Sequence, residues 1–561
     1  MSSIDKVFSF LVTTDNHLGY KHDDPVRGQD SFKSFEESLQ VAKEKNVDFI
    51  LLGGDLFHVP RPNLDSMNKC STIIRKYTFT GEKKHSFTRI GGEFSHEKFK
   101  HGNFEDPGYN VACPIFSIHG NHDEPVGSDP LCACQALASN GSLNYFGCFP
   151  RKNQEITISP LVLKKGEIKV AIYGLGFLPD ALLKRKWERN QVHFATPPEN
   201  SFTVLVLHQN TNCHGSTSSS YIKDEVVPEF FSLVIRGHEH DALDPIKMMS
   251  RDQIVFQPGS TVATSLGHGE ALPKRVGIVH VRKSLFTKNP QNPYISEIDL
   301  IPLKTCRKIL LKDLYWSQTE QYVQRRIDEL RHSSPPDIAQ YVKDFVCREL
   351  DTMLQEYEFE NSDPDSSGEL NLPPAPLVRI RVEFTDSEQC FGQADFKNDY
   401  YPKKVANKDI VLFKRQKVIL TDSGERVTTF EDSQGVEDDD YDPLDDFNPE
   451  PLVIDRLLNR YFDDKPQDER PRTINFDNFV SGISKDEYQP KYVETHVQAR
   501  YKYWKKKFEK MIVDEEWAGK NLNDELSIRA LIEELLADEM KENMQFNSMF
   551  SGGDMDNYLM S

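Results

Sequence analysis

The chain has 561 residues, of which 38% are hydrophobic, and a formal net charge of −20. A chain of this length is too long to fold around one hydrophobic core, so we expect two to four domains. No apolar stretch approaches the roughly 20 residues that span a bilayer, and the N-terminus MSSIDKVFSF lacks the pattern of a secretory signal, so we expect no membrane insertion and no secretion. Nine scattered cysteines without C-x-x-C spacing indicate reduced thiols, as in a cytosolic or nuclear protein.

The acidic charge is concentrated in the second half of the chain. Residues 1–300 hold 33 Lys and Arg against 34 Asp and Glu, whereas residues 301–561 hold 35 against 54. Binding to phosphates normally depends on clustered positive charge. The nearly neutral first part therefore neither supports nor excludes a DNA partner.

Strand and helix patterns alternate through the first 300 residues. Apolar residues at helical spacing predict helices over 29–46, 64–77, 130–139 and 180–190. Apolar, β-prone segments predict strands at VFSFLVTT and DFILLGG, and near 114–118, 167–174, 202–207, 232–236, 253–257 and 275–281. The stretch 79–113 lacks periodicity and is expected to be a long inserted loop. This alternation predicts a layered α/β or αββα domain over residues 1–305.

The pattern changes beyond residue 305. A mostly helical stretch over about 311–357 and the alternating strand LVRIRVEF predict a smaller α+β domain over 306–420. The acidic segment 421–450 predicts a linker or disordered loop. Amphipathic stripes over 451–545 predict C-terminal helices, which either pack on their own domain or dock onto another protein. The tail 546–561 gives no confident structure.

Polar residues with metal-binding side chains follow the predicted strands. Five motifs carry them: D-x-H, GGD, GNHD, a His that ends FTVLVLH, and GHEH. In chain order the residues are Asp15, His17, Asp55, Asn121, His122, His208, His238 and His240. Because ligand-binding loops gather where the strands of an α/β fold end, we expect these residues to converge at one rim.

The donor set indicates two metal ions rather than one structural zinc. Imidazole, carboxylate and amide oxygen without thiolate suit Mn²⁺, Fe²⁺ or Zn²⁺. Asp55, next to the flexible Gly53-Gly54 pair, is the natural bridge between two cations. Such a pair can hold a phosphodiester oxygen and activate water. Each motif alone also fits a turn, a helix cap or a buried histidine, but their common order at successive strand ends favours one dinuclear site.

The sequence segments around these residues resemble those of a known family. TTDNHLGY, GGDLFHVPRP, FSIHGNHDEP, VLHQNTNCHGST, IRGHEHDA and QPGSTVATSLGHGEA resemble the calcineurin-like metallophosphoesterases and, within them, the eukaryotic meiotic-recombination-eleven (Mre-eleven) nucleases of DNA double-strand-break repair. The resemblance covers about residues 7–305 and continues more weakly beyond. It implies a layered αββα phosphodiesterase domain, a smaller α+β capping domain over 306–420, and C-terminal helices. Phosphatases of the superfamily carry D-R-G where this chain has Leu-Phe-His-Val.

The resemblance also implies the role of each site residue. One metal would be held by Asp15, His17, Asp55 and His240, and the other by Asp55, Asn121, His208 and His238. The two ions would be Mn²⁺. His122 would protonate the leaving oxygen or stabilise the transition state. His58 would steer the DNA backbone, with a loop histidine facing water as the alternative.

Activity, partners and location follow from the same resemblance. It implies a nuclear 3′ to 5′ double-strand exonuclease and single-strand or hairpin endonuclease. DNA, an SMC-like ABC ATPase (Rad-fifty) bound by the C-terminal helices, and nibrin held by the loop 79–113 would be its partners. Homodimerisation would use helices near 64–77 and 130–140. The acidic C-terminal half without a glycine-arginine-rich tail departs from the family. Two alternatives remain: a phosphoesterase acting on nucleotides or phosphoproteins, and a non-catalytic repair scaffold.

Overall fold

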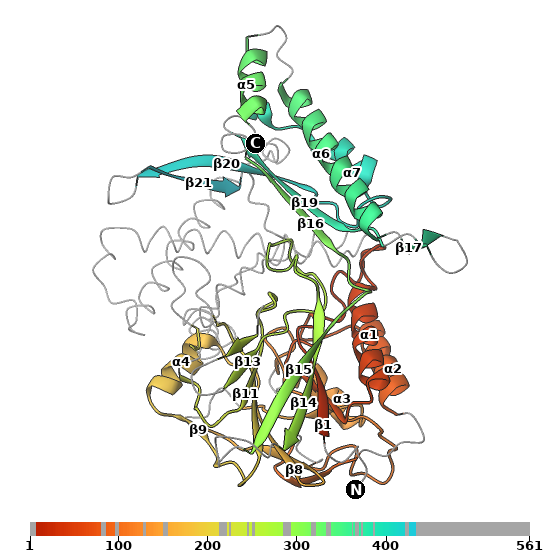
Figure 1. Cartoon of the computed structure of the whole chain (residues 1–561), viewed down its shortest axis with the longest axis vertical. Coiled ribbons are helices and arrows are strands. Elements are labelled where there is room, and N and C mark those ends of the chain that lie inside the picture. Colours follow the sequence, from red (N-terminus) through yellow and green to blue (C-terminus); the bar gives the residue numbers. More distant parts are fainter. Residues whose placement is uncertain are drawn as a thin grey trace, which may run out of the picture. The chain divides into compact units, whose positions relative to one another are not determined.

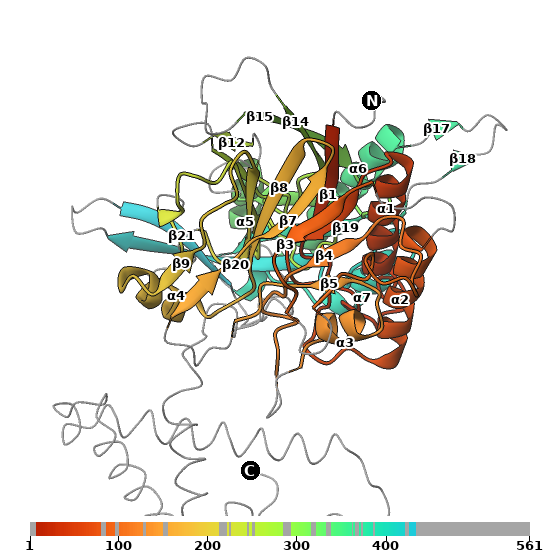
Figure 2. The same cartoon turned by 90° about the horizontal axis from the view of Figure 1, so that it is seen from below.

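The computed structural model describes most of the chain between Val7 and Asp432, and Figures 1 and 2 show it in two views. The described residues are 7–79, 86–95, 100–126, 131–149, 155–211, 221–223, 226–243, 246–248, 253–283, 293–315, 321–332, 338–361, 363–364, 370–371, 374–384, 387–420 and 426–432. All described residues belong to one compact unit within Met1–Asp446. The predicted helices over 451–545, the tail 546–561 and residues 433–450 of the predicted linker lie outside them.

Two β-sheets occupy the part of the chain up to residue 302. The first has the strand order β15-β14-β1-β2-β4-β5, and the second has the order β12-β13-β11-β10-β8-β7-β3. The strands of the first sheet are β1 (Val7–Thr13), β2 (Phe49–Leu52), β4 (Ile115–Ser117), β5 (Asn144–Tyr145), β14 (Arg275–Lys283) and β15 (Tyr294–Pro302). Those of the second are β3 (Thr88–Gly91), β7 (Leu161–Lys165), β8 (Ile168–Leu175), β10 (Phe202–His208), β11 (Leu233–Gly237), β12 (Lys247–Met248) and β13 (Ile254–Phe256). A short parallel pair, β6 (Ile156–Ile158) and β9 (Val192–Phe194), stands apart from both.

The middle of each sheet is parallel. In the first sheet β1, β2, β4 and β5 run in one direction, and in the second β8, β10, β11 and β13 do so. The carboxyl ends of neighbouring parallel strands therefore share one edge, which is where ligand-binding loops gather in α/β folds.

Side-chain alternation divides the core into three layers. Phe10 of β1 and Val204 of β10 belong to one buried cluster that contains residues of both sheets. The next residues along these strands face the opposite side of each sheet. Leu11 packs with helices α1 (Asp30–Glu44), α2 (Leu64–Thr78) and α3 (Ala133–Ser139), and Leu205 packs with α4 (Asp180–Glu188). Strands buried on both faces account for the nearly continuous apolar runs in the sequence. Figures 1 and 2 show α1 and α2 on one side of the strands and α4 on the other, which confirms the αββα layering.

The described residues of the predicted inserted loop 79–113 include a strand and buried aromatic side chains. Within it β3 pairs antiparallel with β7, and the side chains of Phe87, Phe94 and Phe104 are buried in the core between the sheets. These aromatic side chains fill the core from an irregular segment, so no periodicity marked them in the sequence.

A separate group of elements follows residue 305. Its sheet has the order β16-β19-β20-β21, and its helices pack on this sheet around a core of their own. The elements are β16 (Ile309–Leu314), α5 (Gln321–Leu330), α6 (Ile338–Asn361), β17 (Asp363–Pro364), β18 (Leu370–Asn371), β19 (Leu377–Phe384), η3 (Ser387–Gln389), α7 (Gln393–Tyr400), β20 (Val411–Leu420) and β21 (Arg426–Asp432).

The structure corrects two expectations in this part. The start of the predicted helical stretch 311–357 is wrong, because β16 pairs with β19 through Leu314. The predicted acidic linker also begins too early, because β21 extends the sheet into it by pairing with β20. In the described part of the chain, no helix is long and apolar enough to cross a membrane.

Candidate metal centre

Every predicted site residue lies at or just after the carboxyl end of a parallel strand. Asp15 and His17 follow β1, Asp55 and His58 follow β2, and Asn121 and His122 follow β4. His208 is the last residue of β10, and His238 and His240 follow β11. Contacts between these residues, such as those of Asp55 with His208 and of Asp15 with His240, join the two sheets at this rim. The structure therefore brings together the whole set that the sequence singled out.

The loops that carry the ligands adopt strained backbone conformations. Asp15, His17, Asp55 and His238 have φ values of 51°, 44°, 50° and 84°, in the left-handed region that non-glycine residues rarely occupy. Hydrogen bonds between the loops hold them there, since Asp15 N donates to Gly54 O at 3.1 Å and His17 N donates to Asp55 O at 3.0 Å. Such strain persists where the surrounding structure enforces it, typically at functional sites.

The first ligand group contains Asp15, His17 and His240. Their ligand atoms lie within 4.8 Å of one another. His17 Nε2 is 3.0 Å from His240 Nε2 and 4.0 Å from Asp15 Oδ1, and it is 3.8 Å from Asp55 Oδ2. Asp55, the fourth ligand predicted for the first metal, thus lies beside this group.

The second group contains Asp55, His208 and His238, whose ligand atoms also lie within 4.8 Å of one another. Asn121 Oδ1 joins them, at 3.1 Å from His208 Nε2 and 2.9 Å from His238 Nδ1. Asp55 Oδ2 is 3.2 Å from His208 Nε2. The same oxygen also faces His17 of the first group, so Asp55 lies next to both groups.

Several atoms at this site can offer a lone pair to a cation. His208 Nδ1 lies 2.9 Å from the carbonyl oxygen of Gly53, which can only accept, so this nitrogen carries the ring proton and Nε2 offers its lone pair. In the neutral ring that lone pair converges with Asn121 Oδ1 and with the buried Asp55 Oδ2. Acceptors crowded in this way are stabilised by a positive charge between them.

The ionisation of two candidate ligands, His17 and Asp55, agrees with this fit. Burial, together with His240 and His122, holds the pKa of His17 well below its usual range, so this ring is neutral. Burial favours a neutral Asp55, but the surrounding His208 and His122 keep its pKa well below the usual value. Neutral imidazole and ionised carboxylate are the forms that bind metal.

The raised pKa of His208 shows that the site favours positive charge. Burial lowers the pKa of this ring, but the carboxylates of Asp55 and Asp15 overcome that effect and raise it to about 9. A metal ion at the second position would therefore compete with a proton on His208.

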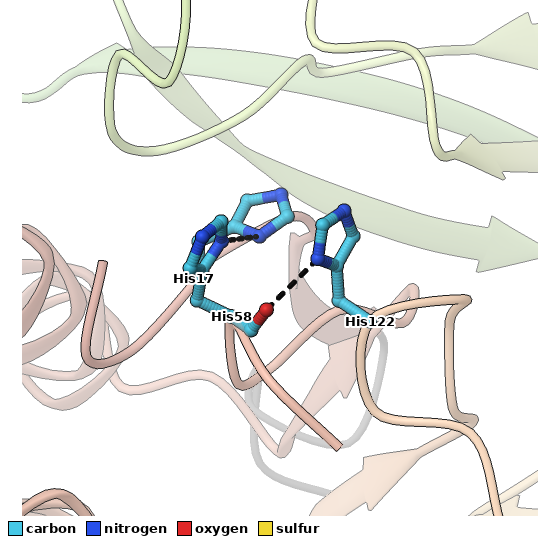
Figure 3. Close-up of side chains that lie close together, drawn as sticks. All are labelled: His17, His58 and His122. Atoms are coloured by element: carbon cyan, nitrogen blue, oxygen red, sulfur yellow. Dashed lines mark hydrogen bonds between the residues drawn. The ribbon is translucent and has the colours of Figure 1, made fainter. Parts of the chain in front are cut away.

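His58 contacts both a candidate ligand and His122. Figure 3 shows the three rings of His17, His58 and His122 close together. His58 Nδ1 is 3.3 Å from His17 Nδ1, and the His58 carbonyl oxygen accepts a hydrogen bond of 2.8 Å from His122 Nδ1. The His58 and His122 rings stack at 5.1 Å between centroids. His58 is thus a partly buried neighbour of the centre.

Some residues around the centre were not assigned from the sequence. Asp123 accepts hydrogen bonds from Leu56 N at 2.8 Å and Gly120 N at 2.7 Å, and so ties two ligand loops together. Glu270 and Thr264 contact the far side of the His240 ring. Asp123 lies in the segment FSIHGNHDEP, and Thr264 and Glu270 lie in QPGSTVATSLGHGEA. Sequence spacing alone does not reveal their contacts.

Comparisons with known proteins match both parts of the chain. Residues 8–242 match the calcineurin-like phosphoesterase family, and residues 296–468 match the Mre11 DNA-binding presumed domain. The chain is 34% identical over 430 residues to the double-strand break repair protein MRE11 of Homo sapiens, covering 75% of this chain and 57% of that protein. It is 34% identical over 487 residues to the double-strand break repair protein mus-23 of Neurospora crassa, covering 85% and 62%. The MRE11 protein of Arabidopsis thaliana is 33% identical over 468 residues, covering 80% and 59%.

The chain spans a little over half of the length of these relatives. The matched residues include every candidate ligand as well as His58 and His122. Residues 8–242 thus belong to the calcineurin-like phosphoesterases, and the chain is a homologue of the MRE11 double-strand break repair proteins.

Proposed function

We propose that this chain is a Mn²⁺-dependent DNA nuclease that hydrolyses phosphodiester bonds in double-strand break repair. The observation that carries the proposal is the convergence of two ligand groups and His122 at the strand ends of a phosphoesterase fold, in a homologue of MRE11 proteins. We propose 3′ to 5′ exonuclease action on duplex DNA and endonuclease action on single strands and hairpins, as the family resemblance implies.

The two groups of candidate ligands suggest which residues would hold each metal ion. We propose that Asp15, His17, Asp55 and His240 hold one ion, and that Asp55, Asn121, His208 and His238 hold the other. When bound, the two ions would stabilise charge on the phosphoryl oxygens and lower the pKa of water toward neutrality. This mechanism needs no nucleophilic side chain.

His122 is suited to supply a proton. Its Nδ1 proton is directed at the His58 carbonyl oxygen, so Nε2 is the nitrogen that exchanges a proton with the substrate. We propose that Nε2 of the protonated ring donates to the oxygen that leaves phosphorus. The fixed Nδ1 contact holds the ring in place before the reaction, which reduces the cost of orienting it.

His58 is proposed to guide the DNA backbone, as the resemblance implies. Its ring packs against those of His17 and His122, at 5.4 and 5.1 Å between centroids, and the Tyr20 ring lies at 4.9 Å. A phosphate that contacted the His122 ring would therefore lie near the stacked His58 ring.

The remaining parts of the chain are assigned by the same resemblance. We propose a nuclease domain over 1–305, a capping domain over 306–420 that contributes to DNA binding, and a helical region over 451–545 that binds an SMC-like ATPase. Nibrin would bind the segment 79–113, and a homodimer would form through α2 and α3. The proposed location is the nucleus.

A nuclease assay tests the proposal. The full chain and a His122→Asn variant are incubated with hairpin DNA and with 3′-recessed duplex DNA, each with Mn²⁺ or Mg²⁺, alone and with the ATPase partner. We expect Mn²⁺-dependent cleavage by the parent chain and its loss in the variant. Equal cleavage by both proteins, or hydrolysis of nucleotide monoesters alone, would overturn the assignment.

A further inference from the structure

A buried carboxylate lies behind the candidate ligand His240. The side chain of Glu270 is 3% exposed and its two oxygens are fully engaged. Oε1 accepts from Ser265 N at 2.8 Å and from the Thr264 hydroxyl at 3.1 Å. Oε2 pairs with Lys274 Nζ at 2.6 Å and accepts from Ser260 Oγ at 3.2 Å. A buried carboxylate is unfavourable unless it is paired and hydrogen-bonded, so this environment is built to keep Glu270 charged.

The hydroxyl of Thr264 connects this carboxylate to the imidazole of His240. Because the hydroxyl donates its single hydrogen to Glu270 Oε1, its oxygen acts as an acceptor toward His240 Nδ1, 2.6 Å away. Glu270 Oε1 itself is 3.4 Å from the same nitrogen. The ring proton of His240 is therefore held on Nδ1, and the lone pair on Nε2 faces His17 at 3.0 Å and Asp15 Oδ1 at 3.7 Å.

The loop that carries these residues is fixed on both sides. The backbone carbonyls of Ala263 and Thr264 accept hydrogen bonds from Arg27 and Tyr20 of the loop after β1. On its other side, Ala263 and Leu266 pack in one apolar cluster with Ile309 and Leu377 of the smaller sheet. The position of Glu270 relative to His240 is thus set by contacts with both parts of the unit.

We propose that Glu270, acting through Thr264, is a positioning residue that fixes the tautomer and orientation of His240 and thereby sets the metal affinity of the first position. Histidine ligands of metals characteristically donate their other ring N–H to such a partner, and loss of the partner typically weakens metal binding by about 10- to 100-fold. The inference rests on the proposed two-metal centre.

A Mn²⁺ titration of the full chain, followed by electron paramagnetic resonance of the free ion, tests the inference without DNA or catalysis. Glu270→Gln removes the charge, and Thr264→Val removes only the hydroxyl from a side chain of the same shape. We expect each variant to bind one of its two Mn²⁺ ions about 10- to 100-fold more weakly than the parent chain. Thr264→Ser keeps the hydroxyl and should bind both ions as the parent does.

Asp48→Asn is the matched control for the loss of a buried ion pair. Asp48 and Lys165 pair at 2.7 Å with side chains that are 5% and 6% exposed, and no candidate ligand contacts them. We expect Asp48→Asn to lower the melting temperature while leaving the Mn²⁺ titration unchanged.

Two failures are distinguishable. If the parent chain binds no Mn²⁺, the proposed metal centre is wrong. If the parent binds two ions and Thr264→Val and Glu270→Gln bind both equally well, or if Asp48→Asn weakens binding as much as they do, the positioning role of Glu270 is wrong.

Discussion

The carbonyl oxygen of His58 accepts a hydrogen bond of 2.8 Å from Nδ1 of His122. The backbone of one residue therefore orients the proposed proton donor, while the ring of the same residue touches the candidate ligand His17. Because these two contacts use different atoms of His58, substitutions can separate them.

Replacing His122 should abolish cleavage and spare metal binding. His122 belongs to neither proposed ligand set, and its role is proton transfer, which typically contributes about 10²- to 10⁴-fold to a rate. We expect His122→Asn to lower the single-turnover rate on hairpin DNA by that factor, while its Mn²⁺ titration matches that of the parent chain. A variant that loses one Mn²⁺ ion would instead identify His122 as a ligand.

Removing the His58 ring should affect the metal centre even when no DNA is present. His58→Ala keeps the carbonyl that orients His122 but loses the Nδ1 contact with His17, which holds this ligand ring in place. We expect about 10-fold weaker binding of one Mn²⁺ ion by isothermal titration calorimetry. His58→Asn offers an acceptor near the same position and should restore part of the affinity. If both variants bind Mn²⁺ as the parent does, the His58 ring acts on DNA alone.

The sequence was sufficient to single out the candidate ligands, which the structure brings together, but not their supporting contacts. Asp55 and His208 could be singled out because a polar side chain follows a long apolar run, and parallel strands end at a common edge. The contact between His58 and His17 depends on loops in which His17 and Asp55 adopt positive φ angles. Non-glycine residues rarely adopt such angles, so sequence patterns do not predict them. Likewise, Glu270 and His240 are 30 positions apart in the sequence, with strands β12 and β13 between them, so their contact depends on the fold.

Fold prediction succeeded where periodicity was strong. The helix over α1 and the strand β10 follow from apolar spacing, and both lie where expected. In contrast, Phe87 and Phe104 reach the core from a segment without regular spacing, and β16 begins a stretch whose adjacent leucines fit a helix as well as a strand. In both cases tertiary packing decided what local pattern left open.

Metal removal should destabilise the chain. The two buried carboxylates of Asp15 and Asp55 lie among converging acceptors, so a bound cation stabilises the folded state and not the unfolded chain. At a free Mn²⁺ concentration of 100 times Kd, one site contributes about 2.7 kcal/mol. Differential scanning fluorimetry should show a higher melting temperature with Mn²⁺ than with a chelator. Asp55→Asn removes the charge of the shared ligand and should lose most of this difference; a variant that retains all of it would argue against Asp55 as the bridge.

The stability of the chain should depend on pH through Asp180, the first residue of α4. Burial raises the pKa of this carboxyl from 3.8 to about 6, despite a hydrogen bond of 2.7 Å from Asn210. Between these two pKa values the folded state binds more protons than the unfolded chain. Stability therefore falls as the pH rises from about 4 to 6 and is not lowered further by this group above that range.

Asp180→Asn isolates this contribution. The amide oxygen still accepts from Asn210, but no charge has to be buried at neutral pH. We expect the variant to gain about 1 to 3 kcal/mol of unfolding free energy relative to the parent chain at pH 7, and little at pH 4. Urea unfolding at both pH values measures the difference. An equal effect at the two pH values would show that the substitution acts through packing or helix capping, because neither of these depends on the proton that Asp180 binds.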